Sequence, residues 1–428
     1  MRRFTNVRVK LVGALAGVLV LAMLLAATAT EAATTVKFSY WGSPEYNQAM
    51  QSLIKTFEAQ NPDIKVETIH IPSKYYDKLL TMIAGGDAPD VSMLAFDRIP
   101  QFVEAGALQP IDSYVAKFRY PVNDLFPAVV NGFTFEGKLY GLPRSFSPFV
   151  LFYNEDMFKQ AGLARSDDWK WADFRAAALK LTPYPGRPTF GFASHFETDG
   201  RLFPEWLFPF IWQNGGEVVD PKTLRSRVLE GATRDAIAFY VDLIQKDKVA
   251  PTSVQGQTYG GSPAMFLNRR AAMIIDAYNM TLSARTQQGL NFDVMRLPYQ
   301  KERATVVFPI GYVVPKAAKN ADAGFRLLAF LGGPEGQKIV PQLGLGMPGL
   351  RSIAESDLFL QPGQQPEHSR VFLLETEIAR PLPAHTPKFQ EWYTAWRQQM
   401  EPVMAGTEAL DTALVRVDRE INRILSNK

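Results

Sequence analysis

The sequence predicts an α/β fold with a mainly parallel sheet and helices on both of its faces. The order of the strand and helix patterns leads to this expectation, while length and composition limit the size of the core and the kinds of site. From residue 36 onward, strand-like and helix-like patterns follow one another as strand, helix, strand, which is typical of a βαβ unit. The chain has 428 residues, 46% hydrophobic and 21% charged, so it can bury a large core and is long enough for two or more domains. It contains no cysteine, which excludes disulfides, thiolate metal sites and thiol nucleophiles.

The first 32 residues have the pattern of a secretory signal peptide. A basic head precedes an apolar run over residues 11–27, and small residues follow it. The run is at the short end of what can span a bilayer, so we expect cleavage rather than a membrane anchor. Residues 1–32 are therefore assigned to a cleavable signal peptide, and the mature chain is expected in the periplasm.

The net charge gives no reason to expect a nucleic acid or an anionic membrane as partner. The whole chain has a formal charge of +3, but residues 1–29 contain four basic residues and no acidic ones, so their removal leaves −1. A nearly neutral mature chain lacks the charge excess that favours such partners.

The mature chain opens with the pattern of a βαβ unit. Residues 36–40 alternate between faces as a strand does, and apolar residues between positions 50 and 57 recur at helical spacing. Asn61-Pro62 ends this helix, and residues 64–71 form the next expected strand. A helix between two strands predicts parallel pairing.

A second helix and strand flank the segment AGGDAPDVSML at residues 84–94. Tyr76, Leu79, Leu80 and Ile83 recur at the spacing of one helix face, and an apolar run over residues 91–94 fits a buried strand. The Asp, Gly and Pro residues of the connecting loop favour turn chemistry over ligand contact when they are taken alone. Loops at sheet edges are nevertheless where ligands bind in open α/β folds.

The rest of the chain continues the alternation. Expected helices cover residues 99–105, 171–181, 236–245, 321–331, 391–400 and 409–425, and apolar runs that fit strands cover residues 149–153, 190–192, 292–298 and 308–314. No internal repeat or low-complexity tract is evident.

The order of these motifs resembles that of the family 1 extracellular solute-binding proteins, the sugar-capturing subunits of ATP-driven importers, which include the maltose- and trehalose-binding proteins. The resemblance is carried in the first half by the strand ending in Trp41, Asn61 to Ile64, Gly85 to Val91 and Ala105 to Asp112. It continues through GKLYGLP at residues 137–143, the aromatic run 206–212, the AAM of residues 271–273, and residues 308–314.

This resemblance implies a two-lobed periplasmic binding protein fold of type II, with a ligand cleft at the hinge. It places the first lobe at residues 33–143 and 279–335 and the second lobe at residues 144–278 and 336–428. It also implies a monomer without cofactor or metal that captures a carbohydrate by hinge closure and delivers it to the permease subunits of an ABC transporter in the inner membrane.

A search for catalytic motifs finds no nucleophile elbow, P-loop, HExxH helix or EF-hand loop, and the four histidines have no ligand spacing. The chain is therefore not expected to be an enzyme. A secreted glycoside hydrolase stays open as an alternative, because its two carboxylates can lie far apart in a sequence. A cell-surface interaction module is a third possibility.

Aromatic residues are the positive evidence for a sugar site, because a pyranose presents apolar C–H faces and a polar rim. Trp41 ends a strand at a loop that is expected to face the cleft, and Ser43, Glu45 and Tyr46 share this loop. Glu45 also fits a helix N-terminus, where a carboxylate is favourable. Asp97 follows the strand at residues 91–94, near an acidic ligand contact of the resembled family, and it fits a helix cap as well.

The segment after Pro143 contributes Arg144, Phe146 and Ser147. Some relatives have a carboxylate close to the position of Ser147, so this chain departs from their pattern. A guanidinium at Arg144 can fork onto sugar hydroxyls, a phosphate or a carboxylate. A polyol or an anionic ligand such as a sugar phosphate is therefore the alternative to a neutral sugar.

Further ligand-binding candidates rest on single motifs of the resemblance. Each of them lies where a relative commonly contacts its ligand, or where an aromatic ring fits a platform, and the set comprises Trp206, Tyr278, Asn279, Gly311, Tyr312 and Arg351.

Overall fold

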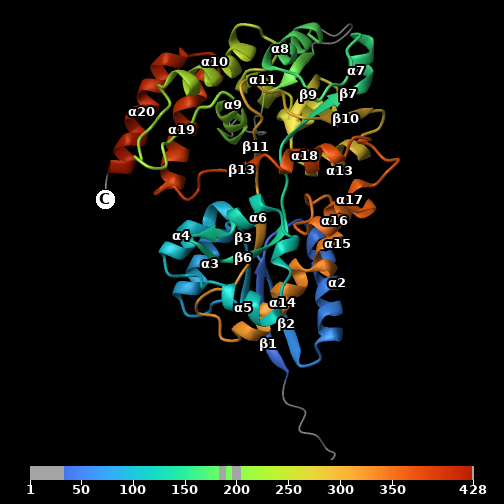
Figure 1. The fold of residues 1–428 in the computed structure, drawn as a ribbon, viewed down its shortest axis with the longest axis vertical. Coiled ribbons are helices and arrows are strands. Elements are labelled where there is room, and N and C mark those ends of the chain that lie inside the picture. The colour runs from blue at the N-terminus through green and yellow to red at the C-terminus, as the bar shows by residue number, and fades with distance from the viewer. Residues whose placement is uncertain (1–32, 183–188, 195–203, 427–428) are drawn as a thin grey trace, which may run out of the picture.

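The structure is a computed structural model that describes residues 33–182, 189–194 and 204–426. The expected signal peptide at residues 1–32 lies outside the described residues. Two lobes are stacked along the long axis of the molecule and joined by several crossing segments (Figure 1). In the described ranges no helix is both long and apolar enough to cross a membrane.

The first lobe is built on a five-stranded sheet of order β2-β1-β3-β12-β6. β1 pairs in parallel with β2 and β3, whereas β12 is antiparallel to β3 and β6. Every strand except β12 therefore runs in the same direction, as a mainly parallel sheet requires. The strands are β1 (Thr34–Tyr40), β2 (Ile64–His70), β3 (Val91–Ala95), β6 (Gly141–Ser145) and β12 (Ile310–Val313).

The helices of this lobe form as their apolar periodicity predicts. In α2 (Pro44–Gln60), the Ser43 side chain accepts from the Tyr46 N–H at the N-terminus, and the expected residues between positions 50 and 57 are buried. The other helices around this sheet are α3 (Tyr75–Ala84), α4 (Ile99–Glu104), α5 (Asp112–Phe118), α6 (Pro127–Gly132), α14 (Ala321–Gly332) and α15 (Pro334–Gln342), followed by α16 (Arg351–Ala354) and α17 (Asp357–Leu360). The small hairpin of β4 (Thr134–Phe135) and β5 (Lys138–Leu139) completes the lobe.

The loop at residues 85–90 lies at the amino end of β3. There the Asp90 side chain accepts from the backbone N–H of Lys37 at 2.9 Å and of Asn320 at 2.7 Å, and Asp87 forms an ion pair with Lys37 at 2.6 Å. In open α/β sheets ligands bind at the carboxyl ends of strands. The structure therefore supports the turn interpretation of this loop.

The second lobe is built on a four-stranded sheet of order β10-β7-β9-β8. β7 is antiparallel to both of its neighbours and β8 is parallel to β9, so every strand except β7 runs in one direction. Its strands are β7 (Val150–Asn154), β8 (Phe190–Ala193), β9 (Ala271–Asp276) and β10 (Phe292–Met295). Its helices include α7 (Glu155–Gln160), α8 (Trp171–Lys180), α9 (Leu207–Gln213), α10 (Gly231–Gln245), α11 (Ser253–Thr258), α12 (Ser262–Leu267), α13 (Asn279–Thr286), α18 (Arg370–Thr376), α19 (Phe389–Met404) and α20 (Leu410–Ser426).

The lobe membership of several elements differs from the expected boundaries. β10 and α13 were expected in the first lobe, within residues 279–335, but β10 pairs with β7 and α13 contacts α12 of the second lobe. Most of α15 and all of α16 and α17 were expected in the second lobe, but α15 contacts β6 and α2, its Ile339 packs against the core of the first lobe, and α16 and α17 contact α15.

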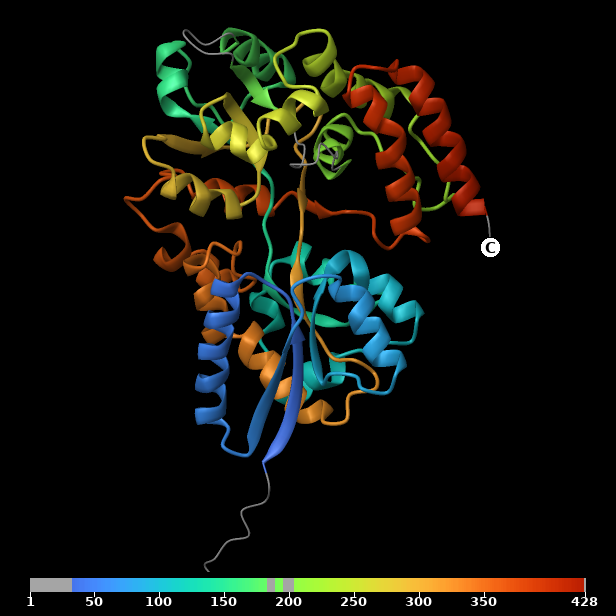
Figure 2. The same cartoon turned by 180° about the vertical axis from the view of Figure 1, so that it is seen from behind.

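Three segments cross between the lobes (Figure 2): the chain from β6 to β7, the chain from β11 (Thr305–Val307) to β12, and a later return that reaches β13 (Ala379–Pro381). β11 and β13 pair in parallel, so two of these segments support each other. The expected boundary between residues 143 and 144 falls within β6, shortly before the crossing segment that leads to β7.

Candidate functional site

The carboxyl ends of β1, β2 and β3 share one edge of the first sheet, which points toward the second lobe (Figure 2). The loops that follow these strands are therefore neighbours in space although they are distant in sequence. They supply Trp41 after β1, residues 71–74 after β2, and residues 96–98 after β3.

At this edge a pocket of about 380 Å³ is lined by aromatic and polar side chains. The ring of Trp41 lies 4.8 Å from that of Tyr75 and 5.6 Å from that of Tyr76, measured between centroids, and the two tyrosine rings are 5.6 Å apart. The remaining lining residues are Pro72, Ser73, Lys74, Asp77 and Arg98. The pocket thus combines flat apolar faces with a polar rim.

Local backbone geometry holds the aromatic group in place. Gly42 has φ +152°, and a Cβ there would lie 2.2 Å from Cδ1 of Tyr46, so only glycine fits after Trp41. The Tyr75 hydroxyl donates to the Ser39 carbonyl at 3.0 Å and lies 2.9 Å from the Ser39 Oγ, so this ring is fixed to β1. Burial raises the pKa of Tyr75, and the hydroxyl stays protonated.

Arg98 lines the pocket, and Asp97 lies beside it in an adjoining pocket that Gln390 also lines. The Arg98 guanidinium lies 4.9 Å from the centroid of the Tyr76 ring, and its Nε is 3.4 Å from Oδ2 of Asp97. Asp97 also accepts from Nε2 of Gln390 at 3.0 Å. Gln390 belongs to α19 of the second lobe, so this hydrogen bond joins the lobes across the opening between them. Burial raises the pKa of Asp97, while the charge of Arg98 opposes the rise.

The second lobe contributes a buried carboxyl opposite this edge. Glu205, in the short 3-10 helix Pro204–Trp206, accepts a hydrogen bond from the Tyr393 hydroxyl of α19. Burial raises the pKa of Glu205 to about 8, and the nearby charge of Asp97 adds to the rise. At neutral pH the Glu205 carboxyl is therefore mainly protonated and can donate as well as accept.

Two predicted site residues, Trp41 and Asp97, lie at the lobe junction, the region where the carboxyl edge of the first sheet faces the second lobe. Trp41 lines the aromatic pocket, and Asp97 accepts from Gln390 of the second lobe. Ser43 is the N-cap of α2 and Glu45 lies in the first turn of that helix, where a hydrogen bond from Ser43 lowers the pKa of the exposed Glu45. Tyr46 is buried in the first core, where its hydroxyl lies 3.4 Å from that of Tyr312.

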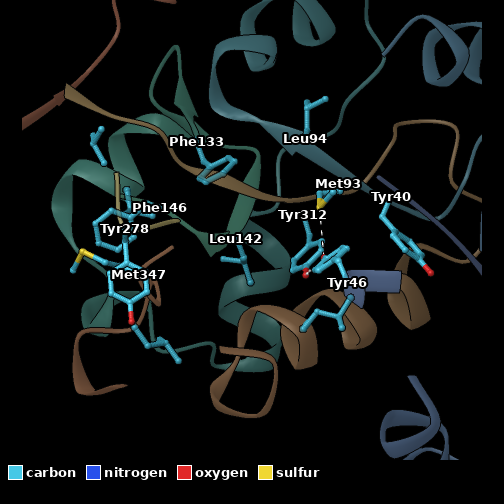
Figure 3. Close-up of a cluster of buried hydrophobic side chains, with 14 of the residues drawn as sticks. Tyr40, Tyr46, Met93, Leu94, Phe133, Leu142, Phe146, Tyr278, Tyr312 and Met347 are labelled. Atoms are coloured by element: carbon cyan, nitrogen blue, oxygen red, sulfur yellow. Dashed lines mark hydrogen bonds between the residues drawn. The ribbon is translucent and has the colours of Figure 1, made fainter. Parts of the chain in front are cut away.

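Tyr312, Gly311 and Phe146 also lie within packed structure. Figure 3 shows the rings of Tyr46 and Tyr312 beside Met93, with Phe146 farther along the same cluster. A Cβ on Gly311 would lie 2.3 Å from the Leu142 carbonyl oxygen, so this glycine is required for strand pairing. These positions favour a packing role.

Ser147 and Tyr278 meet at the hinge. The Ser147 hydroxyl accepts from the Tyr278 N–H at 2.8 Å, and the Tyr278 ring packs against Phe359 with 4.7 Å between centroids. Trp206 stacks on Phe149 at 4.5 Å and donates to the Ile275 carbonyl at 2.9 Å, so it stabilises the hinge region from the second lobe.

Arg351, Asn279 and Arg144 complete the predicted set. Arg351 forms ion pairs with Glu377 at 2.9 Å and Glu355 at 3.3 Å, away from the aromatic pocket. Asn279 is exposed at the start of α13. Arg144 is buried near the carboxyl end of β6.

Sequence reasoning missed several residues of the junction. Tyr76 was assigned to a helix face, and Tyr75 beside it was not considered. Arg98 follows Asp97 directly, so a strand-end loop with adjacent charges was a usable signal. Glu205, Gln390 and Tyr393 meet the first lobe only through tertiary structure, and no local pattern marks them. Among the described residues no group of acidic or histidine side chains is arranged to hold a metal ion.

Known proteins resemble this chain in sequence over most of its length. A galactooligosaccharide-binding protein of Bacillus subtilis is 23% identical over 401 residues, which cover 91% of this chain and 90% of the relative. A putative binding protein of Brucella abortus is 26% identical over 330 residues, which cover 74% of this chain and 76% of the relative.

Solved structures share the fold. An ABC substrate-binding protein of Listeria monocytogenes in complex with cycloalternan has a TM-score of 0.81 at 25% identity, covering 92% of this chain and 100% of that chain. The sugar-binding protein MalE of Xanthomonas citri has a TM-score of 0.80 at 23% identity, covering 92% of this chain and 98% of that chain. These similarities confirm the predicted two-lobed α/β fold. A profile of bacterial extracellular solute-binding proteins matches residues 5–338, and the chain therefore belongs to that family.

Proposed function

We propose that this protein captures a carbohydrate between its lobes and delivers it to the permease of an ABC importer. The observation that carries the proposal is the pocket of Trp41, Tyr75 and Tyr76 beside the Asp97–Arg98 pair, at the edge that faces the second lobe. Relatives named for binding galactooligosaccharides and arabinooligosaccharides, and a structural neighbour bound to cycloalternan, support a carbohydrate as the ligand.

The geometry accounts for capture by closure. Indole and phenol rings cover the C–H faces of a sugar, while Arg98, Asp97 and the protonated Glu205 offer donors and acceptors to its hydroxyl rim. Each lobe supplies only part of this set, so a sugar binds the closed arrangement more tightly than the open one and shifts the population toward it. The Gln390–Asp97 hydrogen bond is one of the contacts that closure forms.

The protein acts as a monomer in the periplasm, where it releases its ligand unchanged and uses no cofactor. Its family consists of binding proteins, which supports the absence of turnover. The net charge of −1 after removal of residues 1–29 supports the expectation that nucleic acid is not a partner.

A thermal-shift screen of the protein lacking residues 1–32 tests this function, because a ligand that binds only the folded state raises the melting temperature. The panel contains mono-, di- and oligosaccharides and polyols. A shift of several degrees with a carbohydrate supports the proposal. Hydrolysis of a chromogenic glycoside in the same preparation, or no shift with any carbohydrate, contradicts it.

A further inference from the structure

Arg144 is a buried cation. The residue is 7% exposed, and among the described residues no carboxylate forms an ion pair with it. Its Nε donates to the Ser145 Oγ at 3.1 Å, and its Nη1 contacts the sulfur of Met93 at 3.6 Å. A guanidinium has five N–H donors, and a thioether is a weak acceptor, so most of its hydrogen-bonding capacity is unused.

Such a group is costly unless something else compensates its charge. Buried charges in proteins are nearly always paired, because burial removes the hydration of the ion. The Tyr46 ring, whose centroid is 5.1 Å from the guanidinium carbon, offsets part of this cost through a cation–π contact. A carboxylate or phosphate would offset more, since it can accept two N–H groups in parallel.

Arg144 lies at the edge of the sheet that carries the aromatic pocket. It is next to the last residue of β6, and β6 runs parallel to β3, because both are antiparallel to β12. Its aromatic partner Tyr46 is in the first turn of α2, whose positive dipole end also favours an anion. Burial raises the pKa of the pocket residue Tyr76, and the charge of Arg144 acts against this rise, so the charge reaches the pocket.

The carboxyls at the junction do not neutralise Arg144. Asp97 is paired with Arg98. Burial raises the pKa of Glu205 to about 8, so Glu205 contributes little negative charge at neutral pH. Glu45 is exposed and hydrogen-bonded to Ser43. Lys74 and Asp77 both line the pocket, and their charges offset each other. Among the described residues at this edge, the charge of Arg144 is therefore left without a carboxylate that pairs with it.

We propose that the captured carbohydrate has an acidic group, a carboxylate or a phosphate, and that Arg144 binds this group. The inference rests on the proposed function and narrows its substrate class. Closure places the acidic group against the guanidinium of Arg144, while the neutral rings of the sugar stack in the pocket of Trp41, Tyr75 and Tyr76.

Calorimetric titration of matched ligands tests the inference. The probes are oligosaccharides of glucuronic or galacturonic acid, glucose and galactose 6-phosphates, and the neutral counterpart of each. An acidic ligand is expected to bind at least about 10-fold more tightly than its neutral counterpart, and the preference should weaken as salt screens the charges. Preference for the uronic acid or for the phosphate ester identifies which acidic group is recognised.

Variants assign the effect to one side chain. Arg144→Met keeps an unbranched apolar side chain against Met93 and Tyr46, and it should weaken acidic-ligand binding about 10- to 100-fold while leaving neutral-sugar binding within about 3-fold. Arg144→Lys keeps the charge and should bind acidic ligands at an intermediate level. Arg423→Met, which removes an exposed cation on α20, is the matched control and should change neither affinity.

The outcomes separate this inference from the proposed function. If neutral sugars bind as tightly as their acidic counterparts, or better, the acidic substrate class is wrong while carbohydrate capture stands. If Arg144→Met and Arg144→Lys both keep the preference for acidic ligands, Arg144 is not the residue that binds the acidic group. The wild-type comparison alone decides the substrate class if neither variant folds. If no carbohydrate binds, both proposals fail.

Discussion

Two aromatic residues show that the chemical type of a side chain does not decide where it lies in the structure. Trp41 and Tyr312 are both aromatic and both were expected in the site, yet only Trp41 reaches the pocket. Tyr312 lies in β12, between β3 and β6, and points into the core beneath α2, where it is 2% exposed. The type of side chain needed for a sugar was predictable. Which ring faces solvent depends on strand register and helix packing, which one sequence does not reveal.

Gly42 offers a test of the pocket's backbone. In Gly42→Ala the new Cβ would overlap the Tyr46 ring at 2.2 Å and the residue would keep a strained positive φ, so the free energy of unfolding should fall by about 1–3 kcal/mol. Urea denaturation measures this loss. Gly231→Ala, where nothing lies within 4 Å, is the matched control and should change stability by less than about 0.5 kcal/mol. Equal stability of the two variants would contradict the role of Gly42.

Glu205 predicts a dependence of stability on pH. Burial raises its pKa from the usual 4.5 to about 8, so between these values the folded protein holds a proton that the unfolded chain releases. The free energy of unfolding should therefore fall as the pH rises through this window, by an amount on the order of a few kcal/mol.

Glu205→Gln cannot titrate, so its stability should decline less between pH 5 and pH 8. Urea denaturation of both proteins at several pH values measures the difference. Glu375, whose pKa burial raises to about 7, is present in both proteins and forms the common background. Parallel stability curves for the two proteins would show that Glu205 is not the buried acid described above.

Whole helices and strands were more predictable than single contacts. α2, α8 and α10 follow the expected periodicity closely, because each has a long apolar face. In α3 the expected face of Tyr76, Leu80 and Ile83 is only partly buried, since Tyr75 turns inward to Ser39 instead and Tyr76 lies at the pocket.

The start of α19 provides a test at the scale of elements, because Gln390 links it to the first lobe. Gln390→Ala removes the hydrogen bond to Asp97 that closure forms, so the closed state loses stability and carbohydrate affinity should fall about 3- to 10-fold. Gln398→Ala, at an exposed position of the same helix, is the control and should bind as the wild type does. Equal affinities of Gln390→Ala and the wild type, measured by calorimetry, would show that this hydrogen bond does not stabilise the closed state.

The architecture of the whole molecule followed from two kinds of sequence information. Repeated βαβ patterns predicted mainly parallel sheets, and the family resemblance supplied the two lobes. The crossing points were harder to place, because strand runs such as residues 292–295 fit the edge of either sheet until their partners are known. The buried cation at Arg144 and the protonated Glu205 are properties of the assembled lobes and have no local signal in the sequence.

Binding of a carbohydrate in the aromatic pocket between the lobes can be measured by titration calorimetry. The protein lacking residues 1–32 is titrated with the best ligand of the thermal-shift screen, together with Trp41→Ala and the control Tyr299→Ala. We predict one site of micromolar or tighter affinity, which is about −8 kcal/mol or more favourable, weakened at least about 10-fold in Trp41→Ala only. Millimolar binding of every carbohydrate, or full affinity in Trp41→Ala, would contradict the account.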